Sequence, residues 1–333
     1  MTMARNGGRT WAIVLAGGDG TRLAALTEAV HGRPVPKQFA TVTGDRSMVQ
    51  ATLDRVARIV PPERTVIVIG RAHLAWARAQ LGAYTATTLV QPASRGTATA
   101  ILYALTWIRL RERDANVLVF PSDHHVENVT RFVEAVRIAD EAARALGKLT
   151  VVGVSPEAGD PDYGWIVAGA PVAPACCSLE CFVEKPGAEV ALRLHACGGL
   201  WNTFILAAPA SLVAELARRH LPEHARRFDA LDRFAFAPGA PDLDELYAAI
   251  EPADFSKHVL ETARDLLVVS MEGTGWSDWG TPERVLASLQ GTPAETLLRA
   301  RLDAAVRRMR APASRRNGPR AGPARALQNR LAR

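Results

Sequence analysis

The sequence lacks several features that would place it in common classes of protein. It has four cysteines in 333 residues, Cys176, Cys177, Cys181 and Cys197, and their spacing matches no usual zinc site. We therefore expect reduced thiols rather than a disulfide framework. No apolar run approaches the roughly 18 residues that a membrane helix requires, and no apolar segment precedes Trp11 as in a signal peptide. These absences predict a cytoplasmic globular protein that does not bind a membrane.

Acidic residues are missing from one end of the chain, which is strongly basic. The net charge is +6, yet residues 307–333 contain nine arginines and no acidic residue. Subtracting these nine arginines leaves −3 for residues 1–306, so the body is slightly acidic. Residues 311–333 are too poor in large apolar side chains to fold alone, and we expect a disordered tail. Nucleic-acid binding by this tail is a less favoured alternative, and it would depend steeply on salt.

Two familiar phosphate-binding motifs are also absent, although a glycine-rich loop is present. The apolar residues 11–16 lead into Gly17-Gly-Asp-Gly20 and then Thr21-Arg22. No Gly-Lys-Ser/Thr follows, and Leu23 stands where the dinucleotide-binding fingerprint requires a glycine. Glycines nevertheless expose backbone N–H groups to phosphate oxygens, and an arginine grips phosphate strongly. We interpret the loop as a triphosphate site; a strand-to-helix turn without a ligand is the alternative.

Further polar candidates lie in the first half of the chain. Two prolines flank an extended segment that would bring Lys37 to the same ligand as a second cation. Gln91 ends a short predicted strand, and its amide could match the edge of a base, with Gly96 leaving room for a flat ring. Asp123 follows a buried strand, where a carboxylate suits Mg²⁺. A surface position for Lys37 and a helix-capping role for Asp123 are the alternatives.

The second half supplies candidates for binding a compact polar ligand. Glu184 and Lys185 are adjacent before a proline, and a bend there would turn both toward one pocket. They could then bind sugar hydroxyls and a sugar phosphate, whereas a surface ion pair is the alternative. Gly164 leaves backbone exposed, and Asn202 offers an amide. Asp278, between two tryptophans, is a second candidate metal ligand.

Predicted strands and helices alternate along most of the chain. This alternation predicts an α/β fold with a mostly parallel sheet and helices on both faces. The predicted strands include residues 65–69 and 266–271, and a helix is predicted to begin with a cap near Ser47. We expect one large domain over residues 1–290, followed by a helical extension over residues 291–310.

Together these motifs resemble the sugar-1-phosphate nucleotidyltransferases. The segments that carry the resemblance are Leu15-Ala-Gly-Gly-Asp-Gly-Thr-Arg-Leu23, Pro36-Lys-Gln-Phe39, Phe182-Val-Glu-Lys-Pro186 and Trp276-Ser-Asp-Trp-Gly280. Gly44-Asp-Arg-Ser47 and Gln50-Ala-Thr-Leu-Asp-Arg55 make the chain most similar to bacterial mannose-1-phosphate guanylyltransferases. The resemblance covers residues 10–290 and implies a Rossmann-like fold of the nucleotide-diphospho-sugar transferase type.

The resemblance implies a reaction and a set of site residues. GTP and mannose-1-phosphate would react with Mg²⁺ to give GDP-mannose and pyrophosphate. The implied nucleotide-binding residues are Leu15, Ala16, Gly17, Gly18, Gly20, Thr21, Arg22, Gln91, Gly96 and Thr97. The implied catalytic residues are Arg22, Lys37 and Asp123, and the metal ligands are Asp123 and Asp278. The sugar phosphate would be bound by Gly164, Glu184, Lys185 and Asn202.

Some positions depart from the family pattern. Ala24-Ala-Leu-Thr27 replaces Trp-Pro-Leu-Ser, and Gln91-Pro92 stands where many guanylyltransferases have Glu-Pro. The Gln-Pro pair resembles thymidylyl- and uridylyltransferases, so a glucose-1-phosphate uridylyl- or thymidylyltransferase is the alternative enzyme. A non-catalytic sensor of sugar nucleotides is the alternative of another class. The sequence shows no fused isomerase domain or hexapeptide repeat, so a bare catalytic unit is expected, and a homo-oligomer stays open.

Overall fold

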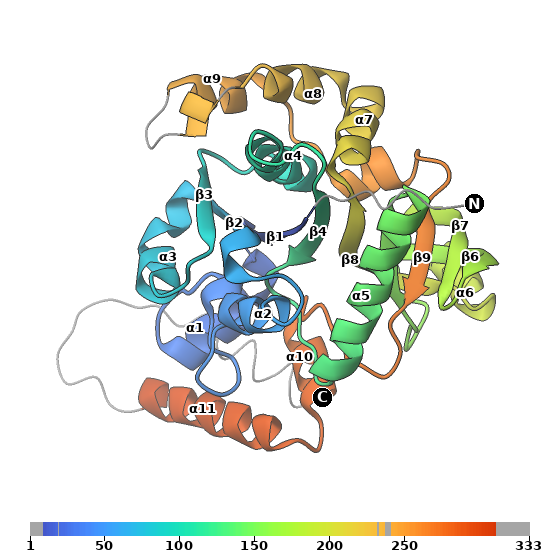
Figure 1. The fold of residues 1–333 in the computed structure, drawn as a ribbon. Helices are drawn as coiled ribbons and strands as arrows, with labels where there is room; N and C mark the ends of the chain where they lie inside the picture. Colours follow the sequence, from blue (N-terminus) through green and yellow to red (C-terminus); the bar gives the residue numbers. More distant parts are fainter. Residues whose placement is uncertain (1–8, 19, 232, 237–240, 311–333) are drawn as a thin grey trace.

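A nine-stranded sheet forms the centre of the molecule, and helices cover both of its faces (Figure 1). The computed structural model describes residues 9–18, 20–231, 233–236 and 241–310. The strands are β1 (Thr10–Ala16), β2 (Thr65–Gly70), β3 (Thr87–Gln91), β4 (Asn116–Pro121), β5 (Thr150–Val154), β6 (Gly164–Ala173), β7 (Cys176–Glu184), β8 (Leu200–Pro209) and β9 (Leu267–Ser270). The α-helices are α1 (Ala24–His31), α2 (Met48–Val56), α3 (Leu74–Leu81), α4 (Gly96–Arg109), α5 (Val129–Leu146), α6 (Ala188–Ala196), α7 (Ala210–His220), α8 (Pro222–Asp229), α9 (Pro241–Ala249), α10 (Pro282–Leu289) and α11 (Pro293–Arg310).

The sheet combines a parallel and an antiparallel part, in the order β3-β2-β1-β4-β8-β5-β9-β7-β6. The first four strands pair in parallel, as the alternation of strands and helices predicts. β8 runs antiparallel to both β4 and β5, and β6 runs antiparallel to β7. The mixed α/β class is confirmed, with more antiparallel pairing than expected. The short link between β6 and β7 explains part of the difference, because parallel neighbours need a long crossover.

The sheet divides the hydrophobic core into two layers, and the alternating side chains of β1 show the division. Ala12 and Val14 pack with residues of α1, α2, α5 and α11, whereas Trp11 and Ile13 pack with residues of α4, α7 and α8. Figure 1 shows these two groups of helices on opposite sides of the sheet. Successive side chains of a strand point to opposite faces, so a strand that is apolar throughout must be covered on both.

The predicted helix cap and strands appear close to their expected positions. Ser47 and Gln50 form a reciprocal capping box at the start of α2. The predicted strand at residues 65–69 extends to Gly70, and the last strand is one residue shorter at each end than predicted. Helix α11 occupies most of the predicted extension, whereas residues 311–333 lie outside the described residues.

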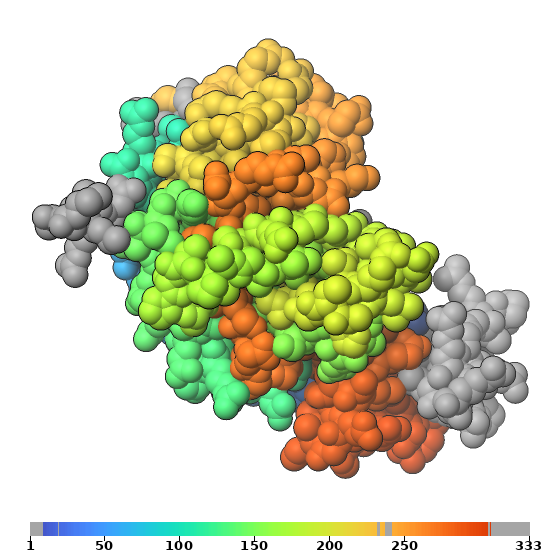
Figure 2. Space-filling view, turned by 90° about the vertical axis from the view of Figure 1, so that its right-hand side faces the viewer, coloured from blue at the N-terminus to red at the C-terminus, as the bar shows by residue number. Residues whose placement is uncertain are grey.

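A second view shows how the antiparallel part of the sheet is flanked. In Figure 2, β6, β7 and α6 form the centre of one face, between α7 above and the α10–α11 region below. All four cysteines are free thiols. Among the described helices, none combines the length and apolar character needed to cross a membrane.

Candidate active site

The glycine-rich loop lies directly against the segment that carries Lys37. β1 ends at Ala16, and the chain turns through Gly17, Gly18 and Gly20 into a 3₁₀ turn at Thr21–Leu23. Gly20 has a φ of +59°, and a Cβ there would lie 2.5 Å from the Cβ of Lys37. A larger residue would therefore be strained and would also push Lys37 away.

A glutamine holds the loop in this position. Nε2 of Gln38 donates hydrogen bonds to the carbonyl oxygens of Ala16 and Gly18, both at 2.9 Å. Gln38 is buried, so these bonds face little competition from water. The sequence places Gln38 in the Pro-Lys-Gln-Phe segment, but sequence reasoning assigned it no role because nothing local shows which carbonyls it meets.

Lys37 joins the two segments that carry the predicted metal ligands. Its Nζ lies 2.8 Å from Oδ2 of Asp123 and donates to the backbone oxygen of Asp278 at 2.6 Å. The Lys37 side chain is only 7% exposed. Burial alone would raise the pKa of Asp123, but Lys37 and His124 outweigh it and hold that pKa below its usual value. The alternative that Lys37 is a surface lysine is wrong.

Backbone pairing brings the same two segments together. His125 and Ser277 form an isolated antiparallel bridge, with N–O distances of 2.8 and 3.1 Å. The His125 ring stacks on Trp279 with ring centroids 4.5 Å apart. The alternative that Asp123 caps the next helix is wrong, because Asn128 caps α5 instead. Residues more than 150 positions apart in sequence thus form one surface.

The carboxylate of Asp278 accepts hydrogen bonds from several donors. Its Oδ1 accepts from the hydroxyl of Tyr163 at 2.9 Å and from the N–H of Gly280 at 3.0 Å. Its Oδ2 lies 3.1 Å from the guanidinium of Arg284. Burial tends to raise the pKa of Asp278, but the charges of His124 and Arg284 outweigh it and keep that pKa low. Asp278 is therefore ionised at neutral pH.

Asp123 and Asp278 carry the type of ligand atom that a hard divalent cation prefers. Both carboxyl groups have lowered pKa values, so each offers charged oxygen. The described part of the chain contains no cluster of three or more His, Cys, Asp or Glu side chains suited to a metal. The protein would thus supply two carboxylates, and this suits Mg²⁺, which takes one or two carboxylates together with substrate phosphates.

Arg22 lies at the exposed edge of the same charged network. Its guanidinium is 3.7 Å from Asp162, and both side chains are more than half exposed. Asp162 also lies 3.3 Å from Arg284, which contacts Asp278. Three ion pairs in series therefore connect Arg22 to Asp278, and Arg22 is open to solvent, where an anionic ligand could reach it. Sequence reasoning missed Arg284, which has no local signal.

The predicted sugar-binding residues form a separate cluster across β6, β7 and β8. Gly164 pairs with Glu184 in the sheet, and a Cβ at Gly164 would lie 2.6 Å from Oε2 of Glu184 and 3.3 Å from Cβ of Asn202. Lys185 adopts a φ of +47°, and its Nζ lies 2.6 Å from Glu184. This left-handed turn supplies the expected bend. Burial raises the pKa of Glu184.

Tyr163 connects this cluster to Asp278. Its backbone oxygen accepts from the N–H of Lys185 at 3.2 Å, while its hydroxyl donates to Asp278. Its ring stacks on Trp201, with centroids 4.2 Å apart. Sequence reasoning gave Tyr163 no role, although it lies beside Gly164. An aromatic residue next to a functional glycine was the available signal.

The predicted base-binding residues have different environments. Gln91 is buried beside the loop, so close that a Cβ on Gly17 would overlap its amide. Gly96 has a φ of +82°, and a Cβ there would overlap the backbone of Ala253. The close packing of Ala253 therefore explains why position 96 is a glycine. The expected reason, room for a base, is not what the structure shows there.

The side chain of Thr97 is already used within the protein. Its Oγ1 donates to Asp254 at 3.1 Å and accepts from the N–H of Phe255 at 2.8 Å. These two bonds fasten the start of α4 to residues 254–255. The hydroxyl hydrogen of Thr97 is therefore already used, which leaves its backbone and one lone pair of Oγ1 for any contact with a nucleotide.

Comparisons with known proteins agree on one family for this chain. Residues 11–293 match the family described as "Nucleotidyl transferase". The "Xanthan biosynthesis protein XanB" of Xanthomonas campestris pv. campestris (strain B100) is 34% identical over 279 residues, covering 81% of this chain and 57% of the relative. A "Mannose-1-phosphate guanylyltransferase" of Escherichia coli (strain K12) is 31% identical, with 82% and 58% covered. The chain thus spans a little over half the length of these curated relatives.

A solved structure shares the fold at similar identity. It is described as a "mannose-1-phosphate geranyltransferase" from Thermus thermophilus and is 33% identical, with a TM-score of 0.74. It covers 86% of this chain, which covers 80% of that one. A UDP-glucose pyrophosphorylase from "acinetobacter baumanii" is similar in fold, with a TM-score of 0.53 at 14% identity.

Proposed function

The chain belongs to the nucleotidyl transferase family, and we propose that it transfers a guanylyl group from GTP to mannose-1-phosphate. The products would be GDP-mannose and pyrophosphate. The observation that carries this proposal is the contact of Lys37 with both aspartate-bearing segments, directly beside the glycine loop. That arrangement places Lys37 against the Asp123 carboxylate, the Asp278 segment and the glycine loop, where phosphate groups would react.

In the proposed reaction, a phosphate oxygen of the sugar phosphate attacks the α-phosphorus of the triphosphate in line, and pyrophosphate leaves. The protein has little covalent work to do, because positioning and neutralisation of charge supply most of the rate. The amides of the glycine loop and Arg22 would hold the β- and γ-phosphates. Lys37 would stabilise charge at the α-phosphorus. Asp123 and Asp278 would hold Mg²⁺, which would supply positive charge to the reacting phosphates.

The cluster on β6, β7 and β8 would bind the sugar phosphate. Glu184 and Asn202 can accept and donate hydrogen bonds to hydroxyl groups, and Gly164 leaves room for the Glu184 carboxylate beside them. Lys185 is 58% exposed at its side chain, so it can exchange its contact with Glu184 for one with the sugar phosphate. Gln91 would read the base from beside the loop.

We assign the catalytic domain to residues 1–290, a helical extension to residues 291–310 and a tail to residues 311–333. The family match supports the first assignment, because it ends at residue 293. The site residues proposed above all fall within the matched segment.

A substrate panel tests the proposed function. The four ribonucleoside triphosphates and dTTP would each be combined with mannose-1-phosphate or glucose-1-phosphate, with Mg²⁺, and release of pyrophosphate measured. GTP with mannose-1-phosphate should give the highest kcat/KM. The Gln91-Pro92 pair, which stands where many guanylyltransferases have Glu-Pro, favours a second candidate, glucose-1-phosphate uridylyl- or thymidylyl transfer. A preference for UTP or dTTP would replace the first assignment. Tight nucleotide binding without pyrophosphate release would instead indicate a sensor.

A further inference from the structure

Arg55 is a buried cation that the proposed reaction does not use. It lies on α2, and only 7% of its surface is exposed. No carboxylate among the described residues lies within 4 Å of its guanidinium. Burial lowers the pKa of Arg55 to about 10, only partly offset by Asp54, so the side chain stays charged at neutral pH. Burying an unpaired charge is costly, so its position calls for a compensating role.

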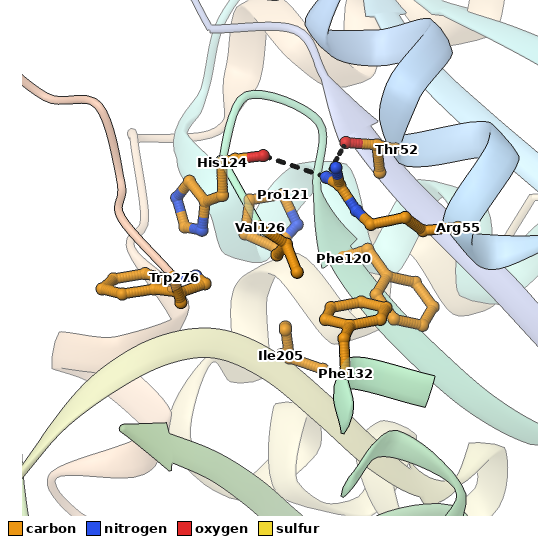
Figure 3. Close-up of a pocket in the computed structure, with 9 residues that line it drawn as sticks. All are labelled: Thr52, Arg55, Phe120, Pro121, His124, Val126, Phe132, Ile205 and Trp276. Carbon is orange, nitrogen blue, oxygen red and sulfur yellow. Dashed lines mark hydrogen bonds between the residues drawn. The ribbon is translucent and has the colours of Figure 1, made fainter. Parts of the chain in front are cut away.

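The guanidinium is directed at the loop that carries Asp123. Its Nη2 donates to the backbone oxygen of His124 at 2.9 Å and to the hydroxyl of Thr52 at 2.8 Å. Thr52 in turn donates to the backbone oxygen of Ser122 at 3.2 Å. Figure 3 shows the two bonds of Arg55, with Phe120 and Phe132 beside its side chain. Two residues one helical turn apart therefore bind the carbonyls on either side of Asp123.

Further backbone hydrogen bonds hold the residues on either side of Asp123. The N–H of Ser122 donates to the carbonyl oxygen of Leu15 in β1, and His125 pairs with Ser277. A small cavity of about 10 Å³ lies between Arg55, His124 and Trp276. So little free space leaves the guanidinium enclosed, where its hydrogen bonds are not weakened by competition with solvent.

We propose that Arg55, together with Thr52, is a positioning residue that fixes the backbone around Asp123 so that its carboxylate is ready to bind a divalent cation. This inference rests on the proposed function, because it concerns the same carboxylate. It differs from a purely structural role, since it requires the loop geometry, and not merely the stability of α2, to depend on Arg55.

The test combines cation binding with kinetics. Mn²⁺ binding would be followed by quenching of tryptophan fluorescence, because Trp276 packs edge-on against His124 and Trp279 stacks on His125. Arg55→Met should raise the half-saturating Mn²⁺ concentration and lower kcat, each about 10- to 100-fold, the usual cost of losing a residue that orients a metal ligand. The KM for the triphosphate should change less than about threefold.

Matched variants separate positioning from general stability. Arg58→Met removes an exposed arginine one turn further on and should leave both readouts unchanged. Arg55→Lys can donate to one of the two acceptors and should restore part of the loss. Thr52→Val, which loses the bond to Ser122, should weaken Mn²⁺ binding about 3- to 10-fold, and it carries the test if Arg55→Met fails to fold.

A lower melting temperature with unchanged Mn²⁺ binding and kcat would overturn the inference. Failure of the proposed function is distinguishable, because the Mn²⁺ titration requires no turnover. A wild-type protein that binds Mn²⁺ but is inactive with every substrate pair would refute the function and leave the positioning role to be judged from the titration.

Discussion

Lys37 is the residue on which the candidate site converges. It contacts Asp123, the backbone of Asp278 and the glycine loop at once, although these segments are far apart in the chain. A buried lysine is stable only when charged or polar partners surround it. Here those partners are the groups that the proposed reaction needs, so the ion pair of the free protein would be replaced by phosphate contacts when substrate binds.

The variant Asp123→Asn tests whether the reaction needs the charge of the Asp123 carboxylate. The amide keeps the shape of the side chain but loses the charge that pairs with Lys37. We expect kcat to fall on the order of 10²–10³-fold, the cost of removing a preorganised charge, as measured by pyrophosphate release. Asp303→Asn, an exposed change on α11, should have no effect. A kcat within a factor of three of the wild type would exclude Asp123 from the reaction.

Lys185→Ala tests the proposed sugar-phosphate contact. Because Lys185 would bind the substrate similarly before and during the reaction, its loss should raise the KM for the sugar phosphate about tenfold and leave kcat nearly unchanged. Initial rates at saturating triphosphate measure both constants. A fall in kcat without a change in KM would show that Lys185 acts on the transition state instead.

His31 gives the fold a dependence on pH. Its Nε2 accepts the N–H of Thr41 at 3.2 Å, and burial, followed by the charges of Arg301 and Arg33, lowers its pKa below 6.5. Below pH 6.5 the unfolded chain therefore binds a proton that the folded protein resists. The stability that the folded protein gains by keeping His31 neutral is fully present above pH 6.5. It is lost as the pH falls toward the lowered pKa of His31.

The variant His31→Gln keeps an acceptor for Thr41 but does not titrate. Between pH 7 and pH 5, its free energy of unfolding in urea should decrease less than that of the wild type. The comparison is a difference between two curves, so other titrating groups cancel. Parallel curves would contradict the role of His31.

At the scale of elements, α11 braces the segment that follows Lys37. Its Leu298 is fully buried in the core beneath α1. Its Arg301 donates to the backbone oxygens of Thr41 and Gly44, at 2.8 and 2.9 Å. The helix therefore contributes both apolar packing and hydrogen bonds to the loop that follows Lys37.

Leu298→Ala measures this packing. Truncating a fully buried leucine leaves a cavity, so the free energy of unfolding should fall by about 2–4 kcal/mol. Leu297→Ala is a matched control in the same helix, because Leu297 is 39% exposed, and it should cost less than about 1 kcal/mol. Equal losses for the two variants, measured by urea denaturation, would show that α11 does not pack as described.

At the scale of the whole molecule, the arrangement of β1, β4 and β8 brings residues of the candidate site together. β1 and β4 are parallel, so the glycine loop and the Asp123 loop follow the carboxyl ends of neighbouring strands. β8 runs antiparallel to β4 and begins near the carboxyl end of β4, which brings Asn202 nearby. The strand order β3-β2-β1-β4 reverses between β1 and β4, and the crevice at such a reversal is where open α/β sheets bind ligands.

Removal of residues 311–333 tests whether the site is complete without the basic end. Every residue given a role here precedes that segment, so kcat and both KM values should stay within about twofold of the full chain. Binding to a DNA fragment at low salt, if the full chain shows it, should be lost on truncation and should fall steeply with salt beforehand. A large loss of activity would show that this segment takes part in catalysis.

The sequence by itself determined the local features: the buried β1 strand, the cap at Ser47, the glycine loop and the polar residues at strand ends. Each depends on hydrogen bonds or periodicity within a few residues, which sequence patterns record directly. It also indicated which side chains could share a ligand, because their types suit phosphate and a hard cation.

Only the tertiary structure decided how those pieces meet. The contact of Lys37 with Asp278, the clamp of Gln38, the links through Tyr163 and Arg284, and the support from Arg55 join residues from distant parts of the chain. It also assigned Gly96 and Thr97 to internal packing. Such contacts depend on strand order and on the mutual packing of layers, and no local pattern encodes them.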